Sequence, residues 1–94
     1  MNKSIKPEDI LPDDESVKII DGVQVRKGTL GAVLANARIL SDASSTPSEK
    51  QAALSVIQEL APALVVLGVY EHIQWKNHEI QKIVEDAARK LHRL

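Results

Sequence analysis

The chain has 94 residues, a formal net charge of −1 and no cysteine, and one tryptophan and one tyrosine are its only aromatic residues. A chain of this length forms one domain with a modest core, and without cysteine it has neither disulfides nor thiolate metal sites. The balanced charge provides no long-range field for nucleic acid or for an anionic membrane. Because the chain has no cysteine, a reducing cytoplasm is the expected location.

Residues 1–16 are predicted to form an acidic, flexible tail, and residues 17–94 a single small domain. Pro7 and Pro12 interrupt the tail, which carries five carboxylates and no apolar run of the kind found in a secretory signal. An alternative is an acidic arm that finds a basic surface on another copy, formed by Arg89, Lys90 and Arg93.

Residues 17–26 predict a β-hairpin, because Asp21-Gly22 is a strong turn signal between β-branched residues. A two-residue loop at Asp21-Gly22 would place Val17 opposite Arg26. A three-residue loop that begins at Ile20 would instead place four β-branched side chains on one face. We expect the longer loop, because the buried face sets the register. The four residues are Val17, Ile19, Val23 and Val25.

A helix is expected from Thr29, as its cap, to about Asp42, with its apolar stripe formed by Leu30, Val33, Leu34, Ala37 and Leu40. The strand, glycine turn and helix start before it could hold an anion through Arg26, Lys27, Gly28 and Thr29, because free N–H groups point outward at a helix N-terminus. The order Lys-Gly-Thr is not that of a phosphate loop, however, and Gly28 is more simply a turn residue.

The most apolar segment, residues 52–70, is expected to lie in a long central helix from Pro47 to Gln74. Thr46 and Glu49 have the spacing of a capping box, with Pro47 at the first helical position. Pro62 predicts a kink rather than a break. A straight helix of this extent would be about 42 Å long, more than the ~30 Å of a compact chain this size. It must therefore bend over the body or be covered by a second chain.

Two other structures are possible for this segment. Residues 64–70 could form a buried strand, because short apolar runs do not distinguish strand from helix. A membrane span is rejected, because Glu59 and Pro62 fall within it and a charge at mid-bilayer costs about 3 kcal/mol or more.

A break at residues 75–77 is expected to precede the last helix, which Asn77 would cap. Glu71, His72, His78 and Glu79 are the only cluster of candidate metal ligands. The two histidines are six residues apart, whereas a zinc helix has a spacing of four. No metal site, cofactor or catalytic residue is predicted, because no nucleophile, base and orienting partner can be assembled from the chain.

The expected fold is of the α+β class, with an N-terminal β-hairpin followed by three helices, the central one long and kinked at Pro62. The expected function is a non-enzymatic interaction or regulatory module that acts as a homodimer, with no nucleic-acid or membrane partner. Its interface is predicted at Leu64, Leu67, Tyr70, Ile73 and Trp75, although Trp75 could equally close the core. The alternative function is a small-molecule or anion binder at Arg26–Gly31.

Overall fold

The computed structural model describes residue 6 and residues 16–92, and the fold class is confirmed within this part of the chain. A two-stranded antiparallel hairpin precedes four helices, of which the central one is long and contains Pro62. The predicted acidic tail, residues 1–16, lies outside the described residues except for Lys6 and Ser16. The elements are β1 (Val17–Ile20), β2 (Val23–Arg26), α2 (Thr29–Ser41), α3 (Pro47–Val66), α4 (Val69–His72) and α5 (His78–Lys90).

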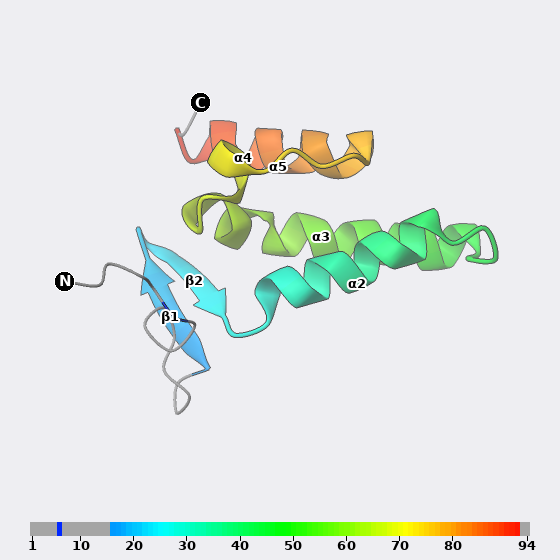
Figure 1. Ribbon diagram of the computed structural model, residues 1–94, viewed down its shortest axis with the longest axis horizontal. Coiled ribbons are helices and arrows are strands. Elements are labelled where there is room, and N and C mark those ends of the chain that lie inside the picture. Colours follow the sequence, from blue (N-terminus) through cyan, green and yellow to red (C-terminus); the bar gives the residue numbers. More distant parts are fainter. Residues whose placement is uncertain (1–5, 7–15, 93–94) are drawn as a thin grey trace.

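Helix α3 is the centre of the structure (Figure 1). Helix α2 lies along one side of it, α5 lies along another, and β2 contacts it near one end of the molecule. The largest fully buried side chains come from α2, α3 and α5, so the core lies where these three helices meet. They are Val33, Ile57, Leu64, Val65, Ile80 and Val84. None of the described helices combines the length and hydropathy needed to cross a membrane.

The hairpin register differs from the prediction. The loop has two residues, and Val17 pairs with Arg26. Asp21 (φ 48°) and Gly22 (φ 81°) both have positive φ, as in the type I′ turn whose twist matches that of paired strands. The turn geometry therefore prevailed over the burial of all four β-branched residues on one face. As a result Ile19 lies on the outer face and is 63% exposed.

The predicted capping box at the start of α3 is confirmed. The N–H of Thr46 donates to Oε1 of Glu49 at 2.7 Å, and the N–H of Glu49 donates to Oγ1 of Thr46 at 3.1 Å. The predicted cap of the last helix is also present, because the N–H of Ile80 donates to Oδ1 of Asn77 at 3.1 Å. Both starts satisfy backbone donors that have no partner within the helix.

Helix α3 ends at Val66 rather than at Gln74, and the predicted extent was wrong. Gly68 has φ 93°, and its N–H donates to the carbonyl of Val65 at 3.0 Å, so a left-handed glycine ends the helix. The chain then turns toward the layer of α5 and forms the four-residue α4 (Figure 1). The alternative strand at residues 64–70 is not formed.

Candidate functional site

The five predicted interface residues do not form one exposed surface. Leu64 is fully buried in the core, and Tyr70 and Trp75 pack against that core as partly buried side chains. Leu67 and Ile73 are 38% and 46% exposed, and they flank the short helix α4. The single chain therefore covers three of the five residues by itself.

Trp75 is held against α5 by a side chain that the sequence analysis did not single out. The backbone N–H of Trp75 donates to Oε1 of Gln81 at 2.8 Å, and Nε2 of Gln81 donates to Oε2 of Glu85 at 3.1 Å. Nε1 of Trp75 is buried and has no hydrogen-bond partner among the described residues. An unpaired buried donor costs about 1–3 kcal/mol, so the packing of the ring must outweigh this cost.

A hollow of about 820 Å³, lined mostly by residues with polar or charged side chains, runs along α5 beside Trp75. Its charged groups have both signs, and Nη1 of Arg89 lies 3.0 Å from Oδ1 of Asp86. Such a mixture selects neither an anion nor a cation. No nucleophile with an adjacent base lines the hollow, which contains His78, Gln81, Lys82 and Glu85 besides the pair already named.

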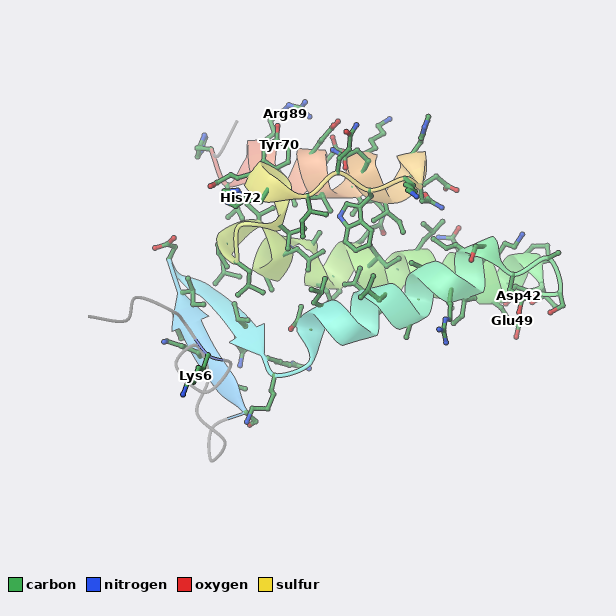
Figure 2. The ribbon with its side chains drawn as sticks, viewed as in Figure 1. Lys6, Asp42, Glu49, Tyr70, His72 and Arg89 are labelled. Atoms are coloured by element: carbon green, nitrogen blue, oxygen red, sulfur yellow. The ribbon has the colours of Figure 1, made fainter. Side chains whose placement is uncertain are left out.

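The candidate metal ligands do not converge. His72 (Figure 2) is exposed. Its Nε2 lies 4.0 Å from Oε2 of Glu71. Within residues 16–92, no three histidine, aspartate or glutamate side chains come close enough together to hold a metal ion.

The predicted anion site has a different local structure from the one expected. Gly28, with φ 84°, occupies the cap position of α2, and Thr29 is the first helical residue. Thr29 is 5% exposed, and its hydroxyl donates to the carbonyl of Arg26 at 2.6 Å, so this hydroxyl is already used. Arg26 and Thr29 line a small hollow of about 220 Å³ together with Glu59, whose carboxylate disfavours an anion there. Lys27 donates its N–H to the carbonyl of Ser16 at 2.8 Å.

The predicted interface did not include the outer face of α2. Leu30 and Leu34 were assigned to the same apolar stripe as Val33, but they are 38% and 52% exposed, and Ile39 is 37% exposed. Gly31 and Ala35 are exposed on the same side of the helix, and Arg38 is the only charged residue among its 13. This near absence of charge was the available signal, because a solvated helix face is normally polar.

Comparisons of the chain with models of known protein families, with curated proteins and with solved structures found no match. The function is therefore argued from the surfaces of the chain alone.

Proposed function

We propose that the protein is a non-enzymatic interaction module that acts as a homodimer, and that the exposed face of α2 is its contact surface. The observation that carries this proposal is the exposure of Leu30, Leu34 and Ile39 on a helix with a single charged side chain. Exposed apolar patches of this kind mark interaction surfaces in proteins.

The α2 face is suited to contact a second copy of itself. Residues four apart on a helix form rows, and the exposed residues of α2 other than Ser41 fall on two adjacent rows. The first row is a ridge that contains Leu30 and Leu34 and ends at Arg38. The second begins with the small residues Gly31 and Ala35 and ends at Ile39. A two-fold axis would place the ridge of each copy in the shallow row of the other, which is a self-complementary contact.

The predicted surface around α4 is a weaker candidate for this role. Leu67 precedes and Ile73 follows the four-residue α4 in the chain, and Leu64 contributes no exposed area. The α2 face, in contrast, extends along a regular 13-residue helix. Regular rows of side chains allow close helix packing, and isolated side chains do not.

The dimer is expected to be weak. Fully burying a leucine or isoleucine side chain contributes about 1.5–3 kcal/mol, and the three large residues of the face are already partly covered. Each therefore gains only part of this value on association, and the contact is weak enough for the dimer to depend on concentration. The fraction of dimer should depend on concentration in the micromolar to millimolar range.

Sedimentation equilibrium over that range tests the proposal with matched variants. Leu34→Asp places a charge in the centre of the face and should give a monomer at every concentration. Ser55→Asp introduces the same charge at an exposed position of α3 and should dimerise like the parent chain. A parent chain that stays monomeric at high micromolar concentration would contradict the homodimer.

A second variant separates loss of the contact from loss of the fold. Gly31→Gln fills the shallow row, while the structure offers open space for a new Cβ and glutamine is a better helix former than glycine. We expect unchanged or higher thermal stability together with a weaker dimer. Equal dimerisation of this variant and the parent would move the contact away from α2.

A further inference from the structure

The hairpin register leaves one strand edge open. Ile20 and Val23 flank the two-residue turn as a hydrogen-bonded pair, and such pairs alternate with non-bonded pairs along antiparallel strands. The N–H of Lys27 donates to the carbonyl of Ser16, which continues this alternation. The main-chain groups of Val17 and Ile19 therefore point away from β2. Within the described part of the chain, the sheet has only two strands and nothing pairs with this edge.

The side chains at this edge are also available for contact. Val17 is 37% exposed and Ile19 is 63% exposed, and both lie on the outer face of the hairpin. Ile19 is the most exposed of the large apolar residues in the described chain. A third strand paired with β1 would cover both side chains and form hydrogen bonds with the outward N–H and C=O groups of Val17 and Ile19.

Lys18 is the only charged residue of β1. It stands between the two apolar residues in sequence and is exposed, as is Arg26 opposite Val17 on β2. Neither Lys18 nor Arg26 forms an ion pair with another residue in the described part of the chain. A carboxylate opposite Lys18 would therefore gain a cross-strand ion pair at no cost to an existing one.

A second copy of β1 does not fit this edge well. Antiparallel pairing that uses the outward groups of Val17 and Ile19 in both copies brings Lys18 directly opposite Lys18 of the other copy. Opposed residues of a non-bonded pair have Cα atoms about 4.5 Å apart, and like charges at that position are destabilising. Lys18 therefore works against self-pairing and in favour of an acidic partner.

We propose that the outer edge of β1 binds an extended acidic–apolar peptide segment of another protein as an antiparallel third strand. A carboxylate of the peptide lies opposite Lys18, and β-branched residues on either side of it lie beside Val17 and Ile19. The main-chain hydrogen bonds supply affinity, and the charge selects the sequence. This site is separate from the α2 face and does not depend on the homodimer.

Fluorescence anisotropy with two labelled peptides tests the proposal on the full chain. The probe is acetyl-Thr-Val-Glu-Val-Thr-amide, and the control peptide carries lysine in place of glutamate. We expect the glutamate peptide to bind more tightly by about threefold or more, because one cross-strand pair is worth about 0.2–1 kcal/mol and the control adds repulsion. Lys18→Glu should reverse this order, whereas Lys76→Glu, at an exposed lysine in the segment before α5, should leave it unchanged.

Ile19→Pro gives a second, backbone-level test. Proline removes the outward N–H of Ile19 but no donor of the β1–β2 ladder, so the hairpin is retained and peptide binding should be lost. Retention of the fold is checked by protection of the amide of Lys18, which pairs with Val25. Unaltered binding by this variant, equal affinity for both peptides, or no binding of either would overturn the proposal.

Amide hydrogen exchange at Val17 and Ile19 identifies other occupants of the edge. We expect both amides to exchange rapidly in the chain alone and to become protected when the glutamate peptide is added. Protection without peptide that increases with protein concentration would mean that a second copy covers the edge. Protection without peptide at every concentration would mean that the chain covers its own edge. Either result overturns the proposal and leaves the dimer at α2 to be judged by sedimentation.

Discussion

Asp42 shows how a short linker can be fixed by a single carboxylate. It follows α2, in the turn that joins α2 to α3 (Figure 2). Its Oδ1 accepts a hydrogen bond from the N–H of Ser44 at 2.9 Å and from the Ser44 hydroxyl at 2.8 Å. These bonds, the backbone one first, lower the pKa of Asp42 below its ordinary value, with a smaller contribution from Lys50.

Ser44→Ala should raise the pKa of Asp42 part of the way back, because it removes the hydroxyl but keeps the stronger backbone bond. A carboxyl with a lowered pKa stabilises the folded chain above its unfolded pKa, and that stabilisation is lost as the pH falls through the folded pKa. The variant should therefore lose this contribution at a higher pH than the parent. Carbon-13 NMR titration of the Asp42 carboxyl measures the pKa, with Ser45→Ala as the control. An unchanged pKa in Ser44→Ala would rule out the hydroxyl contribution.

Gln81 fixes the segment before α5, because its side chain accepts a hydrogen bond from the backbone N–H of Trp75. Gln81→Ala should lower the free energy of unfolding by about 1 kcal/mol, the net value of one hydrogen bond. Because Trp75 is the only tryptophan, its fluorescence reports on this segment directly, and its emission should shift to longer wavelength in the variant. Gln74 is an exposed glutamine that lines the hollow beside Trp75 together with Gln81. Gln74→Ala should change neither the free energy of unfolding nor the emission wavelength.

At the scale of the element, Gly68 decides where the central helix ends. Its φ of 93° is unfavourable for residues with a Cβ, although a Cβ there would meet only the imidazole ring of His72, with Cδ2 at 3.4 Å. Gly68→Ala should lower the free energy of unfolding by about 1 kcal/mol through backbone strain alone. Gly31→Ala, inside α2, should raise it by up to about 1 kcal/mol. Chemical denaturation of both variants measures the difference, and equal stabilities would contradict the assigned backbone conformation.

The elements that the sequence predicted correctly depend on neighbours within a few residues. Thr46 with Glu49, and Asn77 before the last helix, are local capping signals, and both are present. The end of α3 was also marked locally, by Gly68, but the apolar run through Tyr70 obscured it. The hairpin register was predicted incorrectly because burial was expected to outweigh turn geometry at Asp21-Gly22.

The candidate surfaces could not be predicted in the same way. Whether Leu30 or Val33 faces the core depends on where α3 lies, and the apolar pattern of α2 is compatible with either side. Leu64 was included in the predicted interface for the same reason, although it is fully buried in the core. Orientation of an element is a property of the packed molecule rather than of its own sequence.

At the scale of the whole molecule, the two proposed surfaces lie on different parts of the fold. The hairpin stands at one end, and α2 extends from it along α3 toward the other end (Figure 1). Substitutions at sites that share no partners have additive effects on free energy. The double variant Leu34→Asp with Lys18→Glu should therefore be monomeric like the first single variant, and should prefer the lysine peptide like the second.

The parent, both single variants and the double variant form a double-mutant cycle. Sedimentation and peptide anisotropy are measured on all four chains. Lys18→Glu alone should dimerise like the parent, because Lys18 is not on α2. Leu34→Asp alone should bind the glutamate peptide like the parent, because each copy carries a complete β1 edge. If Lys18→Glu instead changed the affinity of the dimer, residue 18 would lie at the contact between the two copies, and the hairpin edge would belong to the dimer contact.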